Sequence, residues 1–330
     1  MIKKLFLIFL LISPEVLFSD EKENFNLWIE KFKVRAMEEG ISEHTINNSL
    51  KNAKYLEKVI KYDRFQPEFF EDTKTYTKKR ATLSRMNKAK SLFFKNQKLF
   101  EEVEKKFNVE KELLLSLWGI ETNFGKHVGK MDIISSLATL SYDKRRSEFF
   151  TNELIVLLKL IDRKIINKDT LYGSWAGAFG NFQFMPSAIN EYAIDYDNND
   201  KIELKKSLPD ALASAANYIN KIGWKFNSPC FQKVSLNKKI DKKYINISAK
   251  KIKNYKTIKF WKNKGIVFTE SIDDNIKAAL IIPDLAVLDE DENWPSFLVF
   301  ENYEKVLKWN RSLRFGVTVC TLANMIKNEI

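Results

Sequence analysis

The sequence predicts a mainly helical protein of the α+β class, with a small β-containing region near its C-terminus. Between residues 24 and 226 the apolar residues recur mostly at helical spacing. Between residues 228 and 300, β-prone runs over 244–247, 257–261, 266–269 and 297–300 alternate with lysine-rich turns. A last helix is expected over 313–326. With 330 residues, of which 45% are apolar, the chain has ample length for a folded core.

Residues 1–19 have the pattern of a signal peptide. Lys3 and Lys4 precede the apolar run Leu5–Ile12, and small or turn-prone residues follow as far as Ser19. The apolar run is too short to span a bilayer, and no cysteine near the expected cut offers a lipid attachment point. We therefore expect a soluble, exported, periplasmic protein without a stable membrane anchor. We also expect a monomer.

The composition limits the chemistry that the chain can perform. A formal charge of +12 suits an anionic partner such as a cell-wall polymer, a membrane surface or nucleic acid. The lysines are spread along the chain rather than clustered, and basic clusters interleaved with aromatic residues are missing, so no nucleic-acid partner is expected. His44 and His127 alone do not make a multi-histidine metal centre or favour a histidine-based triad. Cys230 and Cys320 could pair in an oxidising compartment, but sequence cannot show that they are close.

An N-terminal helical region is expected over residues 20–107. Apolar residues recur at helical spacing from residue 24, and Ser42 is expected to cap a second helix. Residues 64–70 contain a proline and are expected to form an extended link. A further, basic helical stretch is expected over 73–107.

The most informative helix of the chain lies in Leu113–Gly125, LLLSLWGIETNFG. Asn108 is the predicted N-cap and Gly125 the predicted C-cap. A helix that is apolar on so many sides normally belongs to a core, and Glu121 stands near its end. Because burial disfavours a charged carboxyl, we expect Glu121 to have a raised pKa, which suits an acid catalyst. The alternative is a glutamate exposed in the last turn.

The second informative stretch is Gly173–Pro186, GSWAGAFGNFQFMP, in which small residues alternate with aromatic ones. Small residues let the backbone approach a ligand closely, and aromatic side chains offer flat apolar surfaces. Such surfaces suit the apolar faces of sugar rings, and Ser174 and Gln183 are polar groups that could bind a hydroxyl or N-acetyl group. The alternative is a glycine-packed junction between helices.

Four motifs occur in a fixed order: GIETNFG, YDKRR, GSWAGAFGNFQFMP and SLPDALASAANYINKIGW. Together they closely resemble the B-type lytic murein transglycosylases, periplasmic enzymes that cut the glycan strands of peptidoglycan. The resemblance is strong over residues 107–224 and weaker but continuous in the flanks. It implies a lysozyme-like catalytic core over residues 108–226. Over residues 227–330 it implies a β-containing region and a C-terminal helix that pack on this core.

The resemblance also implies a reaction and a set of site residues. Glu121 would be the single acid and base: it protonates the oxygen between N-acetylmuramic acid and N-acetylglucosamine, then takes the proton of the muramoyl C6 hydroxyl. That hydroxyl attacks C1 and leaves a 1,6-anhydro product, so no second carboxylate and no cofactor are required. The implied substrate-binding residues are Ser174, Gln183, Arg145, Arg146, Tyr218 and Asn310. The alternative for the two arginines is an exposed basic turn, and the alternative for Tyr218 is packing in the core.

Two aromatic positions depart from the family pattern. Trp309 and Phe315 stand where relatives can carry tyrosine. The sequence therefore lacks two hydroxyl groups that such relatives could use for hydrogen bonds.

The acidic stretch Asp195–Asp210, DYDNNDKIELKKSLPD, resembles a calcium-binding loop. It is not a standard EF-hand, because Asp200 replaces the turn glycine and Lys206 replaces the bidentate glutamate. Some relatives bind calcium in this segment, with a later aspartate closing the site. A structural calcium ion is therefore the candidate ligand, and a plain acidic turn the alternative. The expected ligands are Asp195, Asp197, Asn199, Lys201 through its carbonyl, and Asp210.

Two other functions stay open at this point. A hydrolytic muramidase would use water and a second carboxylate about 5–9.5 Å from the acid; Asp132 and Asp143 lie nearby in sequence, but in no motif that marks them for this role. A catalytically silent peptidoglycan-binding protein would not need Glu121.

Overall fold

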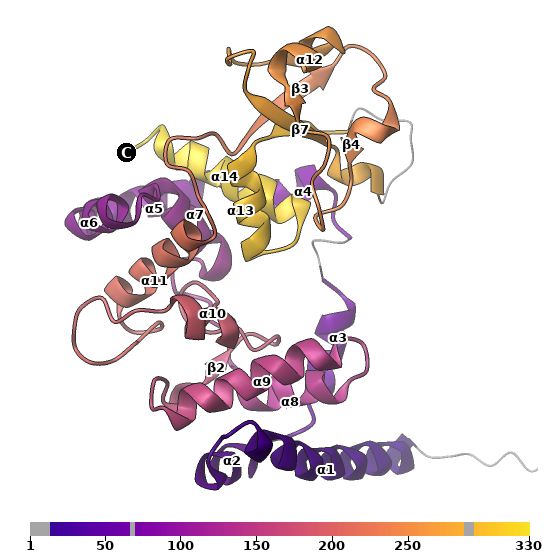
Figure 1. Cartoon of the computed structure of the whole chain (residues 1–330), viewed down its shortest axis with the longest axis vertical. Helices are drawn as coiled ribbons and strands as arrows, with labels where there is room; N and C mark the ends of the chain where they lie inside the picture. Colours follow the sequence, from indigo (N-terminus) through magenta and orange to yellow (C-terminus); the bar gives the residue numbers. More distant parts are fainter. Residues whose placement is uncertain (1–13, 67–69, 287–293) are drawn as a thin grey trace, which may run out of the picture.

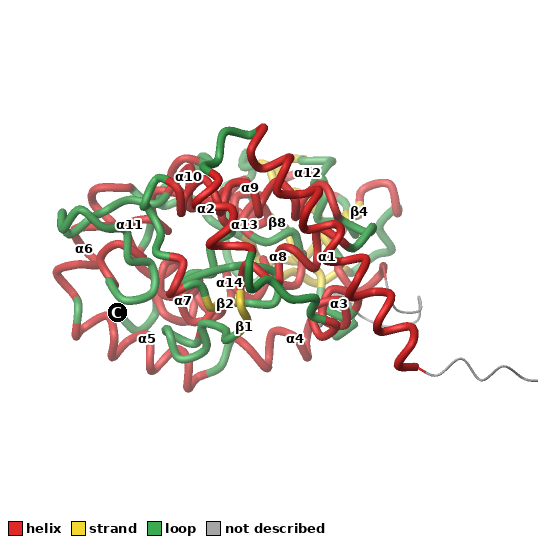
Figure 2. Tube along the Cα trace, turned by 90° about the horizontal axis from the view of Figure 1, so that it is seen from below, coloured by secondary structure: helices red, strands yellow, loops and turns green. Residues whose placement is uncertain are grey.

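The computed structural model describes residues 14–66, 70–286 and 294–330. Most of the predicted signal peptide lies outside the described residues. The predicted fold class is confirmed: helices make up most of the trace and strands gather in two places (Figure 2). None of the described helices is both long and apolar enough to cross a membrane.

The helices and strands have the following bounds. The helices are α1 Pro14–Glu38, α2 Glu43–Leu50, α3 Glu57–Arg64, α4 Thr73–Arg80, α5 Leu83–Lys95, α6 Gln97–Phe107, α7 Lys111–Thr122, α8 Ile133–Tyr142, α9 Ser147–Asp162, α10 Pro186–Tyr192, α11 Leu208–Lys221, α12 Ile258–Asn263, α13 Glu301–Trp309 and α14 Leu313–Lys327. The strands are β1 Met131–Asp132, β2 Tyr172–Gly173, β3 Phe231–Leu236, β4 Ile245–Asn246, β5 Lys256–Thr257, β6 Ile266–Phe268, β7 Lys277–Ile281 and β8 Ser296–Val299.

The predicted N-terminal helices form, but they divide between two places. Helices α1, α2 and α3 pack against α8 and α9 at one end of the long axis (Figure 1). Helices α4 and α5 pack against α14, and α5 and α6 also contact α7. Ser42 caps α2 as predicted, because its Oγ accepts a hydrogen bond from the backbone N–H of Thr45 at 3.3 Å. Phe65 is extended after α3, and residues 67–69 of the predicted link lie outside the described residues.

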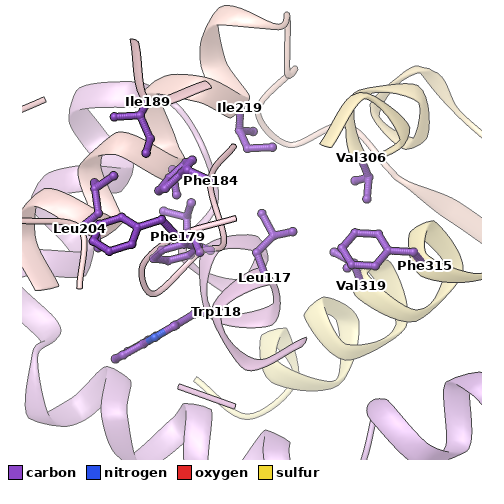
Figure 3. Packing of buried hydrophobic residues seen from close by; sticks show 14 of the residues in the cluster. Leu117, Trp118, Phe179, Phe184, Ile189, Leu204, Ile219, Val306, Phe315 and Val319 are labelled. Atoms are coloured by element: carbon purple, nitrogen blue, oxygen red, sulfur yellow. The ribbon is translucent and has the colours of Figure 1, made fainter. Parts of the chain in front are cut away.

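Helix α7 lies at the centre of the main core, with most of its residues buried. Figure 3 shows Leu117 between the aromatic side chains of the 179–184 loop and Phe315 of α14. Helix α14, which confirms the predicted C-terminal helix, packs along α7. The mainly apolar sequence of α7 follows from this double coverage, since an α-helix that is packed on opposite sides has little surface left for polar residues.

Both predicted caps of α7 are wrong. Asn108 ends the preceding helix, α6, in the left-handed conformation (φ 50°), and Glu110 takes the N-cap position of α7 without a side-chain hydrogen bond. At the other end Asn123 (φ 51°), rather than Gly125, is the C-cap. Asparagine serves both as an N-cap and as a left-handed C-cap, so the residue type alone did not decide which role it takes.

The C-terminal region contains a six-stranded sheet. Strands β4, β7, β8, β3 and β6 follow one another in that order, and β5 also pairs with β7. The pair β4–β7 is parallel and the other pairs are antiparallel. The strand prediction is incomplete, because β3 and β7 were not expected. It is also wrong in one place, because residues 257–261, predicted as a β-prone run, belong mostly to helix α12.

Both faces of this sheet are covered, which explains the apolar run of β7. Side chains on one face, such as Ile281 and Val299, join the main core. Side chains on the other face, such as Leu280 and Leu298, pack with Ile258 and Trp261 of α12 in a second, smaller core. Alternating residues of one strand thus serve two cores.

A disulfide bond connects this region to the helical core. Cys230 precedes β3 and Cys320 lies in α14, and the two sulfur atoms are bonded. The bond joins residues 90 positions apart, and it requires an oxidising compartment in which to persist.

Candidate active site

Glu121 is the penultimate residue of α7 and is half-buried. The helix closes directly after it, because the backbone N–H groups of Asn123 and Phe124 donate to the carbonyls of Gly119 and Trp118. Asn123, Phe124 and Gly125 all have positive φ, so the chain turns sharply away from the helix axis. The carboxyl group therefore lies at the border of the core, at the end of a rigid element.

Trp309 donates a hydrogen bond to Glu121. Its indole Nε1 lies 2.9 Å from Oε1, and it is the last residue of α13, 188 positions away in sequence. An indole N–H is a donor only, so it favours the ionised carboxyl, or the carbonyl-type oxygen of the neutral one, at Oε1. The indole thus supplies a donor where a tyrosine hydroxyl is absent. Sequence reasoning noticed the absent hydroxyl but did not foresee this replacement.

Trp309 also ends a row of stacked rings. Its ring lies 4.9 Å from that of Tyr218, and Tyr218 lies 4.3 Å from Tyr192, with interplanar angles of 24° and 6°. Burial raises the pKa of both tyrosines, to about 12 for Tyr192, so neither ionises near neutral pH. The row offers neutral, flat surface that begins at the carboxyl group. Tyr192 was missed by sequence reasoning, since a lone tyrosine at a helix end carries no signal.

The loop Gly173–Pro186 is fixed to the end of α7 through Asn181. Its Oδ1 accepts from Trp118 Nε1 at 3.1 Å, and its backbone carbonyl accepts from the Thr122 hydroxyl at 2.7 Å. A Cβ at Gly125 would lie 2.6 Å from the same Oδ1, so only glycine allows this approach. The loop is therefore a glycine-packed junction. The prediction that its aromatic rings face a ligand is wrong for Phe179, Phe182 and Phe184, which are buried in the main core, and only Trp175 stays half-buried.

Ser174 and Gln183 are half-buried in this loop. Ser174 Oγ accepts a hydrogen bond from Ala178 N at 2.9 Å, which leaves its O–H as a donor. Gln183 has φ 52° at the tip of a turn, and its Nε2 donates to the carbonyls of Gly180 and Val128 at 2.8 and 3.2 Å. Its side-chain oxygen is therefore the group that it can offer to a ligand.

Arg145 and Arg146 are held by a carboxylate that sequence reasoning missed. Asp63 is 2% exposed. It accepts from Arg145 Nε and Arg64 Nη1 at 2.7 Å each, and it is also paired with Arg146. Burial opposes ionisation of Asp63, but the hydrogen bonds from Arg145 and Arg146 outweigh it, so the pKa of Asp63 is lowered. Both arginine side chains stay partly exposed, at 44% and 38%.

Two predicted positions remain, Asn310 and Phe315. Asn310 follows Trp309 directly and is half-buried, and its backbone N–H donates to Val306 O at 3.1 Å. Phe315 is buried beside Val319 in the core (Figure 3), so its missing hydroxyl is replaced by apolar packing.

The predicted ion-binding carboxylates come together. Oxygen atoms of Asp195, Asp197 and Asp210 lie within 4.8 Å of one another. Asp210 is fully buried and accepts from the backbone N–H groups of Tyr196 and Glu203 at 2.9 and 3.0 Å. Three carboxylates at this separation repel one another unless a cation is shared, and all-oxygen ligands suit calcium. The side chain of Asn199 accepts from Lys201 N at 3.0 Å instead, within the same turn.

The two carboxylates weighed as partners of Glu121 are engaged elsewhere. Asp132 caps α8 by accepting from Ser135 N at 2.6 Å. Asp143 accepts from Arg64 Nη2 at 2.7 Å. Neither arrangement resembles a base that orients a water molecule beside a glycosidic bond.

The family of the chain follows from sequence comparison. The model of the family described as "Transglycosylase SLT domain" matches residues 24–324. The chain belongs to this family. It is also 39% identical over 119 residues to membrane-bound lytic murein transglycosylase B of Escherichia coli, and this stretch is 36% of the chain and 33% of that relative. The matched segment thus spans about a third of the length of that relative.

Solved structures have the same fold. SltB3 of Pseudomonas aeruginosa, in complex with NAG-anhNAM-pentapeptide, superposes with a TM-score of 0.81 at 29% identity, covering 92% of this chain and 79% of that one. SltB1 of the same organism superposes with a TM-score of 0.78 at 22% identity, and the match covers 91% of this chain and 98% of SltB1. Escherichia coli Slt35 in complex with calcium gives 0.75 at 23% identity, covering 93% of each chain. The resemblance to B-type lytic transglycosylases is confirmed.

Proposed function

We propose that this protein is a lytic transglycosylase that cleaves the bond between N-acetylmuramic acid and N-acetylglucosamine in peptidoglycan and forms a 1,6-anhydromuramoyl product. The observation that carries the proposal is Glu121, half-buried at the end of α7, with the neutral indole of Trp309 donating to Oε1 and a row of aromatic rings beside it. Family membership and the peptidoglycan fragment bound to SltB3 support the substrate class.

In the first step, Glu121 acts as the acid. A proton moves from its carboxyl group to the glycosidic oxygen as the bond to C1 breaks, which leaves a carboxylate. Trp309 Nε1 then faces a charged oxygen and makes a stronger hydrogen bond, since bonds to charged acceptors are stronger than neutral ones. Trp309 is therefore a positioning residue that supports the carboxylate without exchanging a proton.

In the second step, the carboxylate acts as the base. It takes the proton of the muramoyl C6 hydroxyl, whose oxygen bonds to C1 of the same sugar and closes the 1,6-anhydro ring. The nucleophile belongs to the substrate, so neither water nor a second carboxylate is needed. The engagement of Asp132 and Asp143 elsewhere supports this mechanism over that of a hydrolytic muramidase.

The binding roles are proposed as follows. The Ser174 hydroxyl donates, and the Gln183 side-chain oxygen accepts, at the sugar next to Glu121. Tyr218 provides ring surface, and Asn310 provides an amide beside Trp309. Arg145 and Arg146, held by Asp63, keep part of each guanidinium exposed for a carboxylate of the substrate.

A calcium ion is proposed as a structural ligand only. The side chains of Asp195, Asp197 and Asp210 would hold it, with help from Asn199 and the carbonyl of Lys201. The ion would join the loop that precedes α11 to the buried start of that helix, and no step of the reaction passes through it.

A periplasmic location is proposed from the signal-peptide pattern and from the disulfide bond, which needs an oxidising compartment. The partner there is the glycan strand of peptidoglycan.

Mass spectrometry of muropeptides tests the function. Purified peptidoglycan is digested with the wild type and with the Glu121→Gln variant. We expect products one water lighter than reducing-end muropeptides, and none of them with the variant. Reducing-end products would contradict the proposal in favour of a muramidase, and retained binding without products from either protein would favour a binding role.

A further inference from the structure

The net charge of the chain is concentrated in one segment of the β-containing region. Residues 237–264 contain eleven lysines, one aspartate and neither arginine nor glutamate, which gives +10 within 28 residues. The other 302 residues together carry +2. The prediction that the lysines are spread rather than clustered is therefore wrong for this segment, and so is the prediction that basic clusters interleaved with aromatic residues are missing. We call residues 237–264 the lysine segment.

The lysine segment is on the surface, at one end of the molecule. All eleven of its lysines are exposed. It includes α12, which lies at the opposite end of the long axis from α1 and α2 (Figure 1). The buried residues of α12, Ile258 and Trp261, face the second core, which leaves Lys259 and Lys262 on the outer side. This end projects beyond the helices that hold Glu121.

Several of these lysines gather around a pair of half-buried aromatic rings. The rings of Tyr244 and Phe260 lie 5.5 Å apart. The Nζ atoms of Lys243 and Lys264 lie 5.2 and 5.8 Å from the centre of the Tyr244 ring. The Nζ atoms of Lys264 and Lys256 lie 5.6 and 5.9 Å from the centre of the Phe260 ring. The ammonium groups therefore surround one apolar spot rather than pointing in unrelated directions.

Few acidic groups compensate this charge. Asp241 pairs with Lys243, and its pKa is lowered first by that hydrogen bond and further by the charge of Lys264. Asp274, outside the segment, pairs with Lys262 at 2.6 Å. These two aspartates cannot neutralise eleven lysines, so the surface has a strong positive potential.

We propose that the lysine segment is a docking surface for an anionic phospholipid bilayer. Lysines act as mobile point charges that suit a diffuse layer of headgroups, whereas a fixed anionic group is better matched by the arginine fork. Tyrosine and phenylalanine at the centre of the patch suit the boundary between headgroups and acyl chains. Docking through this end would hold the protein at a membrane while the site at Glu121 stays clear of it.

Vesicle co-sedimentation of the full chain tests this proposal. The vesicles contain phosphatidylcholine alone or with one third phosphatidylglycerol. The patch variant carries four Lys→Gln substitutions, and the control variant carries four at exposed lysines of α1, α3, α5 and α6, so both have the same net charge. The patch positions are Lys243, Lys256, Lys259 and Lys264, and the control positions are Lys31, Lys58, Lys95 and Lys105.

We expect the wild type to bind only the anionic vesicles, with affinity falling steeply between ~0.05 and ~0.5 M salt because the attraction is screened. Each lysine near an anionic surface strengthens binding about fivefold, so the patch variant should lose about 100-fold or more and the control only a few-fold. Equal losses in both variants would overturn the proposal. So would binding to purified peptidoglycan that depends on the patch while vesicle binding does not. Turnover of soluble glycan strands should be unchanged in both variants, so this test is independent of the proposed chemistry.

Discussion

Two carboxylates at the edges of the core, Glu121 and Asp63, have opposite surroundings. Glu121 lies in the last turn of α7 and accepts a hydrogen bond from the neutral indole N–H of Trp309. Asp63 lies in α3, almost fully buried, and is surrounded by the guanidinium groups of Arg64, Arg145 and Arg146. Three fixed positive charges hold a carboxylate in its ionised form. The neutral indole of Trp309 supports the ionised form of Glu121 without preventing protonation. The surroundings of Asp63 suit a structural anion, and those of Glu121 suit a group that must give up a proton and take it back.

The largest effect is expected at Glu121. The Glu121→Gln variant keeps the shape and the hydrogen bond from Trp309 but cannot exchange a proton, so we expect kcat to fall by about 1,000-fold or more. Thermal unfolding should change little. Glu112→Gln, at a buried glutamate of the same helix, is the matched control and should retain near-normal turnover. Near-normal turnover of Glu121→Gln would refute the assignment.

Asp63→Asn should act on stability rather than on chemistry. Removing a buried anion leaves three guanidinium groups facing a neutral amide, and we expect a loss of about 3 kcal/mol in the free energy of unfolding. Denaturant titration measures it. Asp274→Asn, which breaks an exposed pair with Lys262, should cost less than about 1 kcal/mol. Equal effects of the two substitutions would show that the Asp63 cluster is no tighter than a surface pair.

The same cluster predicts how stability depends on pH. The pKa of Asp63 is lower in the folded than in the unfolded protein, so its contribution is complete above the unfolded value of about 3.9 and is lost as the pH falls through the folded value. The difference in unfolding free energy between wild type and Asp63→Asn should therefore shrink toward acid pH. A difference that stays constant from neutral to strongly acidic pH would contradict this.

Trp309→Phe should have a smaller and more specific effect. It keeps an aromatic ring but removes the N–H, so we expect kcat to fall about tenfold. Because the lost donor supported the carboxylate, the alkaline limb of the pH–rate profile should move to higher pH. Trp261→Phe is the control, since it also loses an indole hydrogen bond, to Ala278 O, far from Glu121 in the second core. It should lower stability without moving the profile. A Trp309→Tyr variant should recover part of the loss.

The smallest effect concerns calcium. If a cation is shared by Asp195, Asp197 and Asp210, adding a chelator should lower Tm by about 3 °C, and restoring calcium should reverse the change. Asp197→Asn should abolish this response. An unchanged Tm with chelator would remove calcium from the account of this loop.

Much of the fold could be predicted from the sequence, because local patterns determine it. The helical spacing around Phe25 and Phe32, and the cap at Ser42, depend on neighbours within one turn. The strands β3 and β7 were missed because their patterns depend on packing between distant parts of the chain. Their side chains serve two cores, so the run of β7 lacks the alternation that marks a strand with one exposed face.

The sequence by itself determined the family, the apolar helix that ends near Glu121 and the glycine-rich loop, because these depend on residue type and order. Tertiary structure alone decided which groups meet. Trp309 reaches Glu121 across 188 residues, Asp63 reaches Arg145 across 82, and Cys230 reaches Cys320 across 90. Hydrogen bonds and disulfides act over a few ångströms, and sequence separation says nothing about distance on that scale once the chain is folded.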